Sequence, residues 1–139
     1  MTRSAVVHVL VGLIGDADGR WLVNRRRPGT DLEGFWEFPG GKLAAGEERF
    51  AALRRELNEE LGIELLSAEP FMELVHDYPQ KRVRLDVWRV LRYRGSICAC
   101  EGQELTWAAL GDLARIGLLP ADRPIVAALE ASPAPTACA

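Results

Sequence analysis

The sequence predicts a single domain of mixed α/β class, in which strands dominate and helices pack against them. Three observations support this class. The chain has 139 residues, 48% of them hydrophobic and 27% charged, a composition typical of a globular domain that buries its own core. Several short apolar runs end at Gly, Pro or Asp-Gly turns, as strands do. One longer segment instead repeats its apolar residues with the period of a helix.

The N-terminal part of the domain is expected to contain three strands. The first covers residues 5–14, the second 21–24 and the third 36–38. Asp18-Gly19 separates the first two apolar runs, and this dipeptide is typical of a tight hairpin turn. Pro39-Gly40-Gly41 ends the third strand, because proline and glycine interrupt regular structure.

The clearest helix begins near Phe50 and ends at Gly62, a residue type favoured at a helix C-cap. Its apolar residues fall within an arc of about 80° when successive residues are placed 100° apart. They are Phe50, Leu53, Leu57 and Leu61. We therefore expect this stripe to face the core.

Two long strands are expected next, at residues 66–78 and 82–93, with a turn at Pro79-Gln80. Apolar and polar residues alternate in the second strand, which predicts one buried and one exposed face. The polar positions expected on the exposed face are Arg82, Arg84 and Asp86. The remaining elements expected are a strand at 105–108, a short helix at 110–116 and a last helix from about Pro124. We expect the domain to span residues 1–130 and residues 131–139 to form a disordered tail.

Composition also limits the partners. A net charge of −3 does not favour a broad basic surface, so we expect no direct binding to nucleic acid. No run reaches the roughly 18 apolar residues of a membrane span. The apolar run at 5–14 carries His8 and has no signal-peptide cleavage site after it, and the three cysteines match no zinc spacing. These features predict a cytoplasmic protein without membrane contact.

Three glutamates of the expected helix lie at positions i, i+3 and i+4, so their carboxylates share one face: Glu56, Glu59 and Glu60. Like charges this close repel each other. One interpretation is a solvated acidic face, partly paired with Arg54 and Arg55. The other is a site for Mg²⁺ or Mn²⁺, which prefer carboxylate oxygens, bind phosphate and activate water. We favour the metal site, because it also accounts for the glycines that flank the helix.

The spacing around these glutamates resembles the Nudix box, G-x5-E-x7-R-E-U-x-E-E-x-G-U, where U is apolar. Every specified position matches, from Gly41 and Glu47 to Gly62 and Ile63. A chance match in a chain of this length has a probability on the order of 10⁻⁸. The resemblance implies the Nudix fold, a mixed sheet packed between helices. It also implies a hydrolase that cleaves a nucleoside diphosphate linked to another moiety.

Four further segments resemble the MutT-type members of this family, which hydrolyse 8-oxo-dGTP to the monophosphate and pyrophosphate. These segments are Arg25-Arg26, residues 36–42, Glu101-Gly102-Gln103 and residues 120–124. The resemblance implies an 8-oxo-dGTP diphosphatase, which removes oxidised dGTP from the nucleotide pool used in DNA replication and so prevents mutation.

The resemblance also implies roles for individual residues. The metal ligands would be the Gly40 carbonyl, Glu56, Glu59, Glu60 and Glu101, with Mg²⁺ as the ion and Mn²⁺ as the alternative. Glu56, Glu59 and Glu101 would act in catalysis, with Arg55 orienting a carboxylate from outside the ligand set. The general base stays open between Glu59 and Glu101. Arg26, Phe38 and Asp122 would bind the substrate. Independently of the resemblance, we expect Lys42 to add charge for the phosphates and Tyr78 to stack on the base. The alternative interpretations are an ordinary surface lysine and an aromatic residue that ends a strand.

Asp122 departs from the MutT-type pattern, which has asparagine there. 8-Oxoguanine presents an N7–H donor beside the O6 acceptor, a pair that an amide matches and an ionised carboxylate does not. Asp122 is therefore protonated, or it binds another edge of the base, or the base is not 8-oxoguanine; an N-cap before Pro124 is a further interpretation.

Related Nudix enzymes that act on CTP or 5-modified dCTP have an aspartate at the position of Asp122. A cytosine nucleotide is therefore the alternative substrate. A non-catalytic Nudix-fold binding module ranks lower, because such modules usually lack carboxylates of the box.

Overall fold

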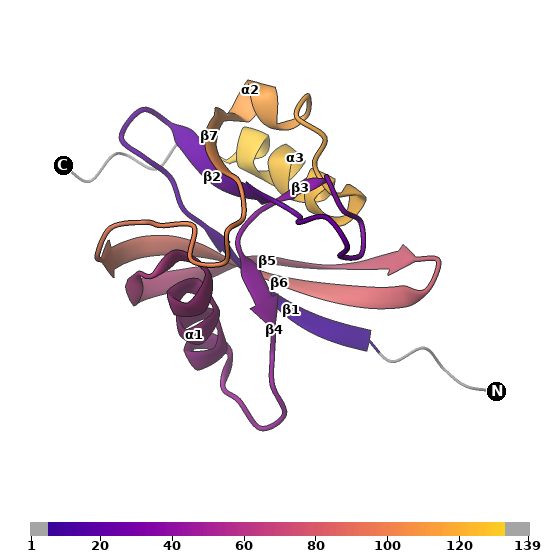
Figure 1. Cartoon of the computed structure of the whole chain (residues 1–139), viewed down its shortest axis with the longest axis horizontal. Helices are drawn as coiled ribbons and strands as arrows, with labels where there is room; N and C mark the ends of the chain where they lie inside the picture. The colour runs from indigo at the N-terminus through magenta and orange to yellow at the C-terminus, as the bar shows by residue number, and fades with distance from the viewer. Residues whose placement is uncertain (1–5, 133–139) are drawn as a thin grey trace. The chain divides into compact units, whose positions relative to one another are not determined.

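The computed structural model describes residues 6–132, which form two compact units. The first unit comprises residues 6–14 and 39–102, and the second comprises 15–38 and 103–132. Both units combine strands with helices, which confirms the mixed α/β class (Figure 1). Most of the expected tail, residues 133–139, lies outside the described residues. Within the described part of the chain, no helix has the length and apolar character needed to cross a membrane.

The first unit is a four-stranded mixed sheet with one helix, α1 (Arg49–Leu61). The strand order is β4-β1-β6-β5, where β1 and β6 are parallel and the other neighbours are antiparallel. The strands are β1 (Val6–Leu13), β4 (Gly40–Lys42), β5 (Glu64–Tyr78) and β6 (Lys81–Arg94). Helix α1 packs against β4, β5 and β1, and strands β5 and β6 form a long ribbon beside it (Figure 1).

Helix α1 forms as its apolar period predicts. Leu53, Leu57 and Leu61 are fully buried, and Gly62 ends the helix with a φ of 70°, a left-handed conformation that favours glycine. At the other end, the Glu48 side chain accepts hydrogen bonds from two amides of the first turn. Because the leucines face the sheet, the glutamates of the helix lie on another side of it.

The second unit is a three-stranded antiparallel sheet with short helices. The strand order is β3-β2-β7, and the strands are β2 (Arg20–Arg25), β3 (Trp36–Glu37) and β7 (Leu105–Ala109). The helical segments are α2 (Leu110–Leu113), the 3-10 turn η1 (Pro120–Asp122) and α3 (Arg123–Ala131). The fully buried side chains of this unit include Leu22, Leu113, Leu118 and Ile125. Helix α2 is shorter than expected, whereas the position of the last helix is confirmed.

The expected hairpin at Asp18-Gly19 is only partly correct. The turn forms, because the Asp16 carboxylate accepts hydrogen bonds from the backbone amides of Asp18 and Arg20. A single antiparallel β-bridge joins Gly15, before the turn, to Trp21, after it. Beyond it β1 and β2 belong to different sheets, because both edges of β1 are already paired with β4 and β6.

The position of Asp86 also differs from the expectation. The alternating pattern placed this residue on the exposed face of β6, but it is 0% exposed. Its carboxylate accepts hydrogen bonds from Arg49 Nε and Nη2, at 2.6 and 2.8 Å, and from Trp88 Nε1, at 2.8 Å. It also lies 2.9 Å from Nε2 of His8. A carboxylate tolerates burial when its oxygens are bonded in this way.

Candidate active site

The glutamates of α1 form a carboxylate face beside its buried leucines. Glu56 is the more protected, with a side chain that is 16% exposed, whereas Glu59 is 52% exposed. Glu60 is half-buried. One face of a single helix therefore presents both a protected carboxylate and one open to water.

Arg55 is bonded on both sides by carboxylates. Its Nε and Nη2 atoms lie 2.7 and 2.9 Å from the oxygens of Glu47, and Nη1 lies 2.8 Å from Oε1 of Glu56. Nη2 also donates to the Lys42 carbonyl at 3.1 Å. The hydrogen bond from Arg55 lowers the pKa of Glu47 to about 2. Sequence reasoning gave Glu47 no role beyond its place in the motif, because the loop before α1 conceals that it faces Arg55.

The carboxylates around Glu56 repel one another. Burial raises the pKa of Glu56, Arg55 lowers it by hydrogen bonding and charge, and the charges of Glu59 and Glu101 raise it further. Glu101 lies in the turn after β6, so two separate segments bring negative charge to this place. A divalent cation held by oxygen ligands would relieve this repulsion.

Two glycines of β4 let the backbone approach these carboxylates. A Cβ on Gly41 would overlap the carboxyl group of Glu56, and a Cβ on Gly40 would overlap the Leu10 carbonyl. Gly40 has a φ of 155°, and its amide donates to Oε1 of Glu60 at 3.1 Å. Clustered carboxylates against a glycine backbone are a donor set that fits a hard divalent cation. The role of the Gly40 carbonyl as a ligand stays a prediction.

Two residues expected to bind substrate lie in the first unit. Lys42 is exposed at the end of β4, and its carbonyl accepts the bond from Arg55. Tyr78 ends β5. The centroid of its ring lies 4.5 Å from the ring centroid of His76 and 5.9 Å from Nζ of Lys81. The turn between β5 and β6 is at the end of the ribbon away from α1 (Figure 1). The structure therefore does not bring Tyr78 to the glutamates.

Arg26 in the second unit is bonded to Glu37. Nη1 of Arg26 lies 3.2 Å from both carboxylate oxygens of Glu37. Asn24 is buried next to them and donates to Oε2 of Glu37 at 3.5 Å. Among the described residues, Asn24 Oδ1 is the one buried side-chain nitrogen or oxygen atom without a hydrogen-bond partner. The sequence did not indicate Glu37 or Asn24, because β3 pairs with β2 only through the fold.

Asp122 does not cap α3, so that interpretation is wrong. Asp122 stands at the N-cap position, but its side chain accepts no hydrogen bond from the first turn of the helix. Its Oδ2 instead accepts the backbone N–H of Phe38 at 3.0 Å. Burial raises the pKa of Asp122 to about 8; the Phe38 N–H opposes the rise, the charge of Glu37 adds to it and that of Arg26 opposes it. At neutral pH this carboxyl group is therefore mostly protonated.

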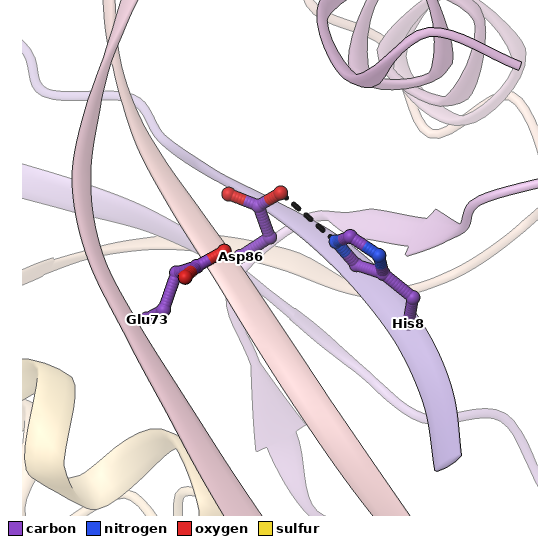
Figure 2. A group of neighbouring side chains, drawn as sticks. All are labelled: His8, Glu73 and Asp86. Atoms are coloured by element: carbon purple, nitrogen blue, oxygen red, sulfur yellow. Dashed lines mark hydrogen bonds and ion pairs between the residues drawn. The ribbon is translucent and has the colours of Figure 1, made fainter. Parts of the chain in front are cut away.

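A second group of potential metal ligands lies apart from the glutamate face. His8, Glu73 and Asp86 each have a ligand atom within 4.8 Å of the others. Figure 2 shows His8 on β1, Asp86 on the adjacent strand β6 and Glu73 on β5, the next strand of the sheet. However, both Asp86 oxygens are bonded to Arg49, which also lies 3.9 Å from Glu73. A guanidinium group thus supplies the positive charge there, and this cluster joins α1 to the sheet.

Comparisons with known proteins cover nearly the whole chain. The sequence model of the NUDIX domain matches residues 10–128. The CTP pyrophosphohydrolase of Escherichia coli (strain K12) is 35% identical over 122 residues, which cover 88% of this chain and 90% of that protein. The 8-oxo-dGTP diphosphatase of the same organism is 32% identical over 124 residues, which cover 89% and 96%. The solution structure of the E. coli ORF135 protein matches with a TM-score of 0.80 at 34% identity, covering 92% of this chain and 91% of that one.

Proposed function

The chain belongs to the NUDIX domain family and is a Nudix hydrolase, and we propose that it hydrolyses 8-oxo-dGTP to 8-oxo-dGMP and pyrophosphate with Mg²⁺ as its cofactor. Its role would be to remove oxidised dGTP from the nucleotide pool before DNA replication. Three observations support this proposal: the complete motif from Gly41 to Ile63, a relative named 8-oxo-dGTP diphosphatase, and the raised pKa of Asp122.

Nudix hydrolases generally use divalent metal ions, and the oxygen donors on α1 fit Mg²⁺. The proposed ligands are the Gly40 carbonyl and the carboxylates of Glu56, Glu59, Glu60 and Glu101. When bound, the ion neutralises phosphate charge and makes water a better nucleophile. Mn²⁺ accepts the same ligands and is the alternative cofactor.

Other steps of the proposed reaction depend on side chains, which position a metal ligand, remove a proton or neutralise phosphate charge. Arg55 bonds both Glu47 and Glu56, so it is a positioning residue that fixes the Glu56 carboxylate. Either Glu59, which is open to water, or Glu101 removes the proton from the attacking water molecule. Lys42, exposed at the end of β4, adds positive charge for the phosphates.

Glu56 offers the direct test of the glutamate face. Replacing Glu56 with Gln removes one ligand charge, and we expect turnover to fall by at least about 100-fold. The thermal unfolding midpoint should not fall, because the substitution also removes repulsion with Glu59 and Glu101. Glu130→Gln, at an exposed position of α3, is the matched control and should keep full activity. Near-normal turnover in both Glu56→Gln and Glu60→Gln would contradict the assignment.

In this proposal, Asp122 determines which nucleobase the enzyme prefers. A protonated carboxyl group has one O–H donor and a carbonyl oxygen with two lone pairs, so Asp122 can accept the Phe38 N–H and still present a donor and an acceptor to the base. This pair matches the O6 acceptor and N7–H donor of 8-oxoguanine. Because the pKa of Asp122 is raised to about 8, the matching form dominates at neutral pH. Arg26 and Phe38, which are also proposed to bind the nucleotide, belong to the same compact unit as Asp122.

CTP or a 5-modified dCTP is the second candidate substrate. The 35% identical relative from E. coli is named CTP pyrophosphohydrolase. An ionised Asp122 would accept a hydrogen bond from the cytosine 4-amino group. The 8-oxoguanine candidate thus requires the O–H donor of protonated Asp122, whereas the cytosine 4-amino group requires only an acceptor.

A competition assay separates the two candidates. The protein is incubated with Mg²⁺ and equal amounts of 8-oxo-dGTP, dGTP, CTP and 5-hydroxy-dCTP, at pH about 6.5 and about 9. We expect 8-oxo-dGTP to be consumed first at the lower pH, and the preference to weaken at the higher pH as Asp122 ionises. Asp122→Asn should keep the preference at both. Preferential loss of a cytosine nucleotide, shifted toward 8-oxo-dGTP by Asp122→Asn, would instead support the second candidate.

A further inference from the structure

The segment after β6 runs along the C-terminal end of α1 and carries two exposed thiols, Cys98 and Cys100. The amide of Cys98 donates to the Leu61 carbonyl at 2.9 Å, and the amide of Cys100 donates to the Glu60 carbonyl at 3.1 Å. Carbonyls in the last turn of a helix have no partner within the helix, so this segment supplies them. The two cysteines are therefore held in place by the helix that carries the glutamates.

Both thiols face the same glycine. A Cβ on Gly62 would lie 3.2 Å from Sγ of Cys98 and 3.2 Å from Sγ of Cys100. Gly62 is the left-handed C-cap of α1, and its missing side chain leaves the space that the two sulfur atoms share. The two thiols are also hydrogen-bonded to each other.

We propose that Cys98 and Cys100 are an oxidation site, at which a peroxide converts the two thiols into an intramolecular disulfide. One sulfur attacks the O–O bond of hydrogen peroxide and becomes a sulfenic acid, with release of water. The second sulfur displaces the sulfenic oxygen as a second molecule of water. Two thiols and one peroxide thus give one disulfide and two waters, and a thiol reductant reverses the change.

The disulfide would alter the glutamate site from its edge. Hydrogen-bonded sulfur atoms must approach to about 2.05 Å to form the bond, so closure pulls the backbone around Cys98 and Cys100 together. That backbone bonds the Glu60 carbonyl, and Glu101 directly follows Cys100. This consequence rests on the proposed function, because it assumes that Glu60 and Glu101 hold the metal. We expect oxidation to lower turnover about 10-fold, as for other changes next to metal ligands.

The test uses the full chain with Cys138→Ser, so that Cys98 and Cys100 are the only thiols. After treatment with hydrogen peroxide, trypsin releases residues 95–115, a peptide that contains both cysteines and no methionine. We expect its mass to fall by two hydrogen atoms, its reactivity with iodoacetamide to disappear, and dithiothreitol to restore both. The same protein with Cys98→Ser cannot form the disulfide and is the control.

Turnover of 8-oxo-dGTP is measured on the same samples. We expect a reversible loss in the protein with both thiols and no reversible loss in the Cys98→Ser control. Two iodoacetamide-reactive thiols after peroxide treatment would overturn the oxidation site, whatever the activity. A complete disulfide with unchanged turnover would overturn its effect on the glutamates. If the reduced protein hydrolyses no nucleotide, the proposed function fails, while the peptide mass still decides whether the disulfide forms.

Discussion

Two aspartates, one in each compact unit, show how the partners of a buried carboxyl group decide its charge. Asp86 and Asp122 are 0% and 4% exposed, and burial by itself raises the pKa of both. Around Asp86, hydrogen bonds from Arg49 and His8 outweigh burial, and the pKa falls below its usual value. Around Asp122, one backbone N–H is too little, and the pKa rises to about 8. Both side chains are shielded from water, yet one is a carboxylate and the other a carboxylic acid at neutral pH.

The two aspartates therefore stabilise the fold in opposite pH ranges. Asp86 has a lowered pKa in the folded state, so its contribution is present above the unfolded value of about 3.9 and is lost as the pH falls through the folded pKa. Asp122 has a raised pKa, so its contribution is complete below about 3.9 and is lost as the pH rises through about 8. Asp86 is therefore suited to a structural role as a charged group, and Asp122 to hydrogen bonding as a neutral group.

Removing the charge of Asp86 should have the largest effect on stability. Asp86→Asn leaves Arg49 and His8 beside a neutral amide, and we expect the free energy of unfolding to fall by about 2–4 kcal/mol. This is less than for a fully buried pair, because the Arg49 side chain is 43% exposed. Urea denaturation of both proteins at neutral pH measures the difference.

A double-mutant cycle keeps this test specific. With Arg49→Met in the background, Asp86→Asn should cost less, because the guanidinium that requires a carboxylate is gone. An equal cost in both backgrounds would mean that Arg49 does not stabilise Asp86. The comparison with Asp122 would then lose its explanation.

The next largest expected effect is a fall in the free energy of unfolding as the pH rises, caused by Asp122 and opposite in sign to the pH dependence expected from Asp86. Between pH about 6 and about 8 the folded state still holds a proton that the unfolded state has already lost, so the stability contribution of Asp122 should fall by about 2 kcal/mol as the pH rises. Asp122→Asn cannot ionise and should remove this slope. Denaturation curves of both proteins at several pH values make the measurement, and parallel profiles would show that Asp122 does not titrate in this range.

The sequence predicted α1 and its glutamates well because their information is local. Leu53, Leu57 and Leu61 define the buried face, and Gly62 marks the end, all within one short segment. The same segment places Glu56 and Glu60 by helix geometry alone. Periodicity needs no knowledge of the rest of the fold, so the carboxylate face followed from it.

The exposed position expected for Asp86 and the helix-cap interpretation of Asp122 were wrong because the partners of both residues are distant in the sequence. Alternation along β6 assigns Asp86 to water, but Arg49, 37 residues away, lies over that face. Asp122 has the position of a helix cap, yet its acceptor is used by the amide of Phe38, 84 residues away. Local patterns predict which face a residue occupies and do not predict which distant group covers it.

Asp77 provides the smallest and most discriminating effect, because it shares a partner type with Asp86 but not its burial. Asp77 Oδ1 accepts a hydrogen bond from Arg82 Nε, and that bond lowers its pKa, as Arg49 does for Asp86. The side chains of Asp77 and Arg82 are 64% and 53% exposed, so water replaces the interaction when it is lost. We therefore expect Asp77→Asn to leave the thermal unfolding midpoint unchanged within error. A loss as large as that of Asp86→Asn would mean that the arginine contact itself, and not the burial of the charge it neutralises, determines stability.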